Sequence, residues 1–121
     1  MAYILIIDDD NQFRAMLREM LERSGYEVVE ASDGKEGLRL YREKATDLII
    51  TDIIMPEKEG IEVIMELQRD FPDVKIIAMS GGGQLDPGLY LSMAKSFGAQ
   101  YTFDKPVERQ ELLKAVRELL E

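Results

Sequence analysis

The groups of this chain that could carry out chemistry are carboxylates, hydroxyls, amines and the main chain, because the sequence contains no histidine and no cysteine. This composition excludes zinc fingers, disulfide scaffolds, cysteine nucleophiles and imidazole bases. Asp8, Asp9 and Asp10 stand in a row directly after an apolar run, and Asp52 follows a second such run. Ser80 and a segment that contains Lys105 follow two others. A carboxylate nucleophile, a hydroxyl donor and an ammonium are groups that transfer of a phosphoryl group to an aspartate requires.

The strands and helices that must position these groups can be predicted from the sequence pattern. Apolar runs and amphipathic stretches alternate along the chain. Short, nearly continuous apolar runs predict five strands, at 3–7, 27–31, 48–51, 75–79 and 100–103. Apolar residues at helical spacing predict five helices, one after Asp10, one from Ser32-Asp33-Gly34 to about Ala45, and three near 60–70, 89–97 and 108–120.

Five strand and helix pairs with short connections predict one α/β domain over residues 1–121. Strands that are apolar on both faces belong in a parallel sheet with helices on each side. Right-handed crossovers favour a doubly wound five-stranded sheet of order 2-1-3-4-5 over a barrel, which would need more strands.

The net charge of −9 makes a phosphate backbone or an anionic membrane surface an unfavourable partner. We therefore expect no direct nucleic acid binding and no membrane insertion, and we expect a cation or a basic protein surface instead. The missing cysteines and the absence of a signal-like N-terminal segment favour the cytoplasm.

In a doubly wound sheet the functional edge lies at the carboxyl ends of the strands, and four of the five expected strands end there in groups able to do chemistry. Only the second strand ends without such a group. Three aspartates in a row are also typical of a helix start, Asp52 of a turn, and Lys105 of an exposed surface. Their joint placement favours a carboxylate cluster around a divalent cation, and oxygen ligands alone select Mg²⁺, Mn²⁺ or Ca²⁺.

The order of these motifs resembles the receiver domain of two-component response regulators over essentially the whole chain. The matching residues, in chain order, are Ile7-Asp8-Asp9, Asp52-Ile53-Ile54-Met55-Pro56, Gly60, Ser80, Gly98-Ala99 and Lys105-Pro106. The resemblance implies a flavodoxin-like fold and a signalling module that is not a turnover enzyme. Asp52 would accept a phosphoryl group from a partner histidine kinase or histidine phosphotransfer protein.

The resemblance also implies how Mg²⁺, or Mn²⁺ in its place, would be held. Asp9 and Asp52 would bind the metal directly, the backbone carbonyl of Ile54 would add a ligand, and Asp8 would act directly or through water.

Ser80, Gly81 and Lys105 would surround the phosphoryl group in this family. Ser80 would be the switch hydroxyl, Lys105 would bind the phosphate, and the small Gly81 would leave access to it. The Lys105-Pro106 bond is expected to be cis.

Two features depart from the family pattern. Thr102 stands three residues before Lys105, where the family often has an aromatic switch residue, and Tyr101 and Phe103 on either side of it should face the opposite way. The connection 81–88 is long and rich in glycine. It is either a tolerated surface insertion or a phosphate-responsive moving element.

Two other functions stay open. A phosphotransferase of the haloacid dehalogenase class also uses a strand-end aspartate and Mg²⁺, but it would have an aspartate where this chain has Ile54. An interaction module that works without phosphorylation is the third candidate. For the receiver function we expect an effector on the surface made by the fourth helix, fifth strand and fifth helix, and a monomer or a weak dimer that depends on phosphorylation.

Overall fold

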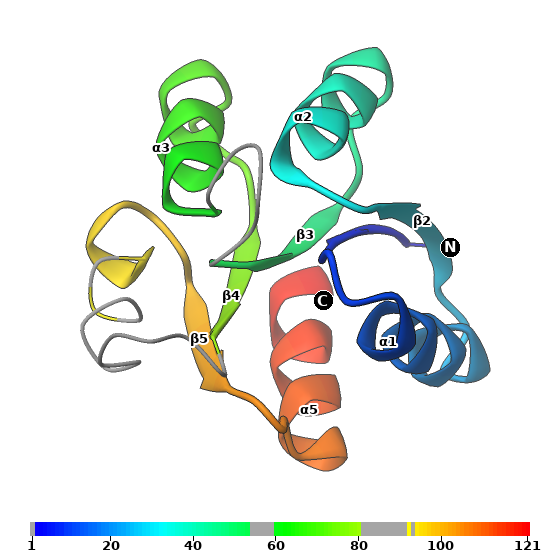
Figure 1. The fold of residues 1–121 in the computed structure, drawn as a ribbon. Helices are drawn as coiled ribbons and strands as arrows, with labels where there is room; N and C mark the ends of the chain where they lie inside the picture. Colours follow the sequence, from blue (N-terminus) through cyan, green and yellow to red (C-terminus); the bar gives the residue numbers. More distant parts are fainter. Residues whose placement is uncertain (1, 54–59, 81–91, 93) are drawn as a thin grey trace.

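The computed structural model describes residues 2–53, 60–80, 92 and 94–121, and it contains a five-stranded parallel sheet of order β2-β1-β3-β4-β5 (Figure 1). This architecture is the one predicted from the sequence. The strands are β1 (Tyr3–Ile7), β2 (Glu27–Ala31), β3 (Leu48–Asp52), β4 (Ile76–Ser80) and β5 (Tyr101–Asp104). The helices are α1 (Asn11–Arg23), α2 (Gly34–Glu43), α3 (Gly60–Asp70) and α5 (Arg109–Leu120).

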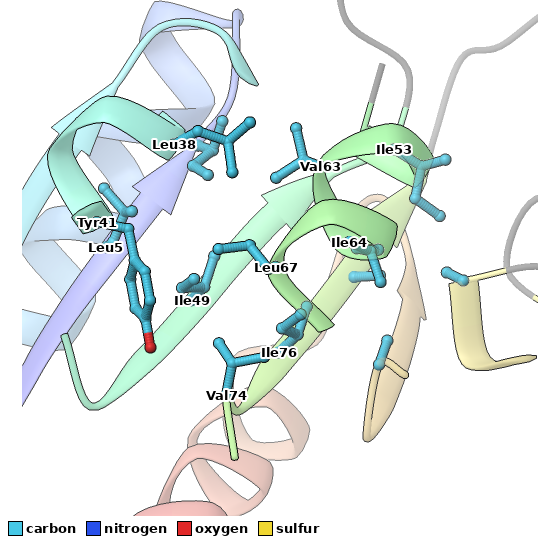
Figure 2. Packing of buried hydrophobic residues seen from close by; sticks show 14 of the residues in the cluster. Leu5, Leu38, Tyr41, Ile49, Ile53, Val63, Ile64, Leu67, Val74 and Ile76 are labelled. Atoms are coloured by element: carbon cyan, nitrogen blue, oxygen red, sulfur yellow. The ribbon is translucent and has the colours of Figure 1, made fainter. Parts of the chain in front are cut away.

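Helices cover both faces of the sheet, so the strands β1, β2, β3 and β4 each contribute residues to two separate cores. On one face, α2 and α3 bury Leu38, Ile64 and Leu67 against Leu5 and Ile49 (Figure 2). On the other face, α1 and α5 pack on the sheet. The buried residues of that second core include Ile4, Ile6, Leu17, Leu21, Ile50, Ile77, Leu112 and Val116. The central strands are therefore apolar on both sides, as a doubly wound sheet requires.

Three of the described helices have an N-cap side chain that accepts hydrogen bonds from the first turn. Asp10 accepts hydrogen bonds from the backbone N–H groups of Gln12 and Phe13 at the start of α1. Asp33 caps α2 and Glu108 caps α5 in the same way. Each cap satisfies donors that the first turn of a helix leaves without partners.

Several predicted boundaries and burials were wrong in detail. Asp52 and Ser80 are the last residues of β3 and β4, whereas both were predicted to follow their strands. Ala45 is exposed because α2 ends at Glu43. Met16 on α1 stands at the helical spacing typical of core residues, yet it is 46% exposed because it lies beside the buried stripe. Met65 on α3 is exposed to the same extent.

The helix predicted near 89–97 falls mostly outside the described residues. Within the part that is described, residues 92 and 94–96 are helical, and Ala94 is buried against the face that carries α2 and α3. Over the described ranges, none of the helices has the length and apolar character needed to cross a membrane.

Candidate functional site

Three carboxylates meet at the carboxyl edge of the sheet. Asp8 directly follows β1 and Asp52 ends β3, and these two strands are neighbours in the sheet. Asp8, Asp9 and Asp52 each offer a carboxylate oxygen, and the three oxygens lie within 4.8 Å of one another. Asp8 and Asp52 are buried, and Asp9 is exposed. The cluster predicted from the strand ends is therefore present.

The third residue of the aspartate run has a different task. The Asp10 side chain caps α1, while its backbone N–H donates to Asp8 Oδ1 at 2.9 Å. Both interpretations of the run thus hold for different members: Asp10 starts the helix, and Asp8 and Asp9 join Asp52.

Lys105 directly follows the edge strand β5, and its side chain extends to this cluster. Its Nζ donates to Asp8 Oδ2 at 2.8 Å and to Asp52 Oδ2 at 3.2 Å. Its backbone N–H donates to the carbonyl of Ser80 at 2.8 Å, which ties residue 105 to the end of β4. The Lys105-Pro106 bond is cis, as the family resemblance implies.

The surroundings of Lys105 keep it charged. Burial alone would lower the pKa of Lys105, but the hydrogen bond to Asp8 and the negative charge of Asp52 outweigh it, so the pKa lies above its usual value. The ammonium also lies over the ring of Phe13, with Nζ 4.3 Å from the ring centroid. Such a contact favours the cation further.

Ser80 presents a buried hydroxyl at the same edge. The residue is 1% exposed, and its Oγ has no hydrogen-bond partner among the described residues. In the sheet register, Met79 pairs with Asp52, so Ser80 lies one position beyond that aspartate. A buried hydroxyl without a partner is costly unless a ligand completes its hydrogen bonding.

These donors fit a hard divalent cation. The cluster supplies carboxylate oxygens only, and two of its three members are buried, where uncompensated negative charge is unfavourable. Oxygen ligands of this kind suit Mg²⁺ or Mn²⁺. Lys105 offsets part of the same charge in this structure.

Some predicted site residues cannot be placed. Ile54, Gly81 and the connection 81–88 lie outside the described residues. Thr102 is half-buried in β5. Tyr101 and Phe103 pack on the α1 and α5 face with stacked rings, as strand alternation predicted.

Two contacts near the cluster were not predicted from the sequence. No group was predicted at the end of the second strand, yet Glu30 on β2 accepts a hydrogen bond from Arg14 of α1, and Arg14 donates to the main chain of Asp8. The contact of Phe13 with Lys105 was not predicted either. Both contacts join side chains of different elements, and no local sequence pattern predicts which side chains meet.

Comparison with known proteins decides the family. Residues 4–117 match the family described as "Response regulator receiver domain". The chain belongs to this family. It is 34% identical to the chemotaxis protein CheY of Thermotoga maritima, over 96% of this chain and 95% of that protein. A receiver domain structure from Clostridium thermocellum superposes with a TM-score of 0.90 at 34% identity, covering 99% of this chain and 94% of that one.

Other receiver relatives are longer. The transcriptional regulatory protein CpxR of Klebsiella pneumoniae is 33% identical over 99% of this chain, but the chain spans only 50% of that protein. Receiver domains are signalling modules of two-component systems and not turnover enzymes. They bind Mg²⁺ at an aspartate cluster and interact with histidine kinases or phosphotransfer proteins and with downstream effectors. Nothing in the comparisons favours a haloacid dehalogenase or an interaction module that works without phosphorylation.

Proposed function

We propose that Asp52 of this receiver domain accepts a phosphoryl group from the phosphohistidine of a partner kinase or phosphotransfer protein. The observation that carries the proposal is the arrangement around this carboxylate. Asp52 is 6% exposed, its Oδ2 lies 3.2 Å from Lys105 Nζ, and it shares the sheet edge with Asp8 and Asp9.

Each side chain has a distinct task in the transfer. An Asp52 carboxylate oxygen attacks phosphorus, a P–O bond forms, and the P–N bond to the donor imidazole breaks. Lys105 is a fixed positive charge that would pair with a phosphoryl oxygen in place of one of its two present carboxylate partners. Ser80 Oγ, which has no partner among the described residues, would donate to another phosphoryl oxygen.

Mg²⁺ is the cofactor we assign to the cluster, with Mn²⁺ as a substitute. When bound, the metal neutralises charge on the phosphoryl oxygens. Asp9 and Asp52 would hold it directly. Asp8 already uses Oδ1 for the N–H of Asp10 and Oδ2 for Lys105, which favours contact through water. The Ile54 carbonyl remains the proposed main-chain ligand.

The signal would leave by a conformational switch. Ser80 would move toward the phosphoryl group, to which the small Gly81 would leave access. Either Thr102 or the connection 81–88 would then change conformation in response. The effector would bind the surface formed by β5, α5 and the helix expected near 89–97. We further propose that residues 1–121 form one receiver domain, a monomer or a weak phosphorylation-dependent dimer, that acts in the cytoplasm, where kinases have ATP.

Intact-mass measurement after exposure to acetyl phosphate tests the function. The parent should gain the mass of one phosphoryl group with Mg²⁺ and little without it. Asp52→Asn should gain none. Asp73→Asn, which removes an exposed aspartate from the opposite edge of the sheet, should react like the parent. A phosphoryl group on Asp52→Asn, or none on the parent, would overturn the proposal.

A further inference from the structure

Arg14 connects the segment that carries Asp8 and Asp9 to the edge strand β2. Its guanidinium uses all three nitrogens. Nη1 donates to the backbone carbonyl of Asp8 at 2.7 Å, Nε donates to Glu30 Oε1 at 2.9 Å, and Nη2 donates to Asn11 Oδ1 at 2.7 Å. A planar fork of donors can make such divergent bonds simultaneously, which fixes where the main chain of Asp8 lies.

The anchor of this connection is itself well held. Glu30 lies on β2, where it pairs in register with Ile6 of β1. Its second carboxylate oxygen accepts from Arg18 Nη1 at 2.6 Å. The Arg14 side chain is 15% exposed, whereas that of Arg18 is 43% exposed.

The charge state of the anchor is also secured. Burial raises the pKa of Glu30, but the hydrogen bonds from Arg18 and Arg14 outweigh it and leave the pKa below its usual value. Glu30 is therefore ionised at neutral pH.

We propose that Arg14 is a positioning residue that holds the Asp8 main chain so that the carboxylates of Asp8 and Asp9 face Asp52. This inference rests on the proposed function, because it assigns Arg14 to the same metal-binding edge. Charge alone would give Arg14 the opposite effect, since a cation near the cluster repels a metal. A favourable effect of Arg14 on Mg²⁺ binding must then come from the position that it imposes on the main chain.

Two lysine substitutions separate positioning from charge and from stability. Arg14→Lys keeps the positive charge, but one ammonium cannot reach three divergent acceptors. Arg18→Lys is the matched control, since Arg18 binds the same Glu30 carboxylate and, among the described residues, its side chain donates only to Glu22 and Glu30.

Calorimetric titration with MgCl₂ measures the effect. We expect Arg14→Lys to raise the dissociation constant for Mg²⁺ about tenfold, as loss of a supporting contact to a metal ligand does elsewhere. Arg18→Lys should stay within about twofold of the parent, because an exposed ion pair contributes little. If Arg14→Lys does not fold, Glu30→Gln replaces it, with a loss in the same direction expected.

Hydrogen exchange of the metal-free proteins gives a readout that does not involve Mg²⁺. The Asp10 amide, bonded to Asp8 Oδ1, should exchange faster in Arg14→Lys and not in Arg18→Lys. Unchanged affinity and exchange in Arg14→Lys would overturn the role of Arg14 while leaving the proposed function standing. Equal losses in Arg18→Lys would also overturn it. A parent that binds no Mg²⁺ would instead contradict the proposed function itself.

Discussion

Lys105 occupies the point of the site where positive charge is most needed. Its ammonium bridges the buried carboxylates of Asp8 and Asp52, which belong to the same cluster that would bind a metal. The lysine and the metal thus neutralise overlapping negative charge. Lys105 should for this reason oppose Mg²⁺ binding and yet assist phosphoryl transfer.

Lys105→Gln is expected to separate these two effects. Without the competing ammonium, the affinity for Mg²⁺ should rise by about fivefold, a modest effect for one unit charge at a partly buried site. Phosphorylation by acetyl phosphate should nevertheless become slower, because a charge on the phosphoryl oxygens goes unmatched. Calorimetry and intact-mass time courses measure the two quantities. Weaker Mg²⁺ binding in this variant would contradict the competition.

Phe13 is expected to hold the Lys105 side chain in position, because the Lys105 ammonium lies over the Phe13 ring. In proton NMR spectra of the parent, the Lys105 methylene next to Nζ should resonate upfield, because Nζ lies 4.3 Å from the ring centroid. Phe13→Leu should remove this shift and slow phosphorylation by about threefold, the effect of losing one cation–π contact. Phe103→Leu, which removes another aromatic from the same core, should leave the shift in place.

At the scale of elements, the site depends on how helices meet strand ends. The N–H of Gly60, the first residue of α3, donates to the carbonyl of Ile53 at 2.7 Å. A Cβ on Gly60 would lie 2.0 Å from the carbonyl oxygen of Asp52. Only glycine lets α3 approach the end of β3 this closely, because the obstacle is main chain that cannot rotate away.

Gly60→Ala should therefore damage both stability and the site. We expect the free energy of unfolding to fall by about 1–3 kcal/mol, the usual cost of overpacking. Phosphorylation of the folded fraction should also slow, because the main chain of Asp52 is displaced. Gly25→Ala is the control: its positive φ of 95° makes alanine strained, but nothing lies within 4 Å of the new Cβ. Equal phosphorylation rates in the two variants would contradict the displacement.

The Glu30 connection between β2 and α1 predicts a pH dependence. Because the folded pKa of Glu30 is depressed, its contribution to stability is present above the unfolded pKa and is lost as pH falls through the folded pKa. Glu30→Gln should lower the free energy of unfolding by about 1 kcal/mol at pH 7. This difference from the parent should vanish in acid, which denaturant titrations over a pH series measure. A difference that persists in acid would mean that packing, not charge, is lost.

How far the sequence predicts these elements depends on the range of the contacts. The strand order and the cluster of Asp8, Asp9 and Asp52 could be predicted from the apolar runs and from the polar residues at the carboxyl ends of those runs. The contact of Arg14 with Glu30 did not, because it joins two elements through long side chains. Met16 shows a second limit of the sequence pattern, because helical spacing alone does not distinguish the centre of an apolar stripe from its margin.

At the scale of the whole molecule, the acidic site adds to a net charge of −9. Carboxylates held close together repel one another in the folded state, and a cation that binds only the folded state removes this cost. Stability and function should therefore be coupled through the metal.

Thermal unfolding with and without Mg²⁺ measures this coupling. Mg²⁺ should raise the Tm of the parent. Asp9→Asn should raise the metal-free Tm by about 3 °C, the shift expected for somewhat less than 1 kcal/mol in a domain of this size. The same variant should respond less to Mg²⁺. A metal-free variant less stable than the parent would indicate that Asp9 is not under repulsion.

Locating the phosphoryl group is the most direct test that Asp52 is the acceptor. Borohydride reduces an aspartyl phosphate to homoserine and leaves phosphoserine and free aspartate unchanged. After reaction with acetyl phosphate and Mg²⁺, peptide mass spectrometry should find homoserine at position 52 and aspartate at positions 8 and 9. Homoserine at another position, or phosphate retained on Ser80, would contradict the assignment.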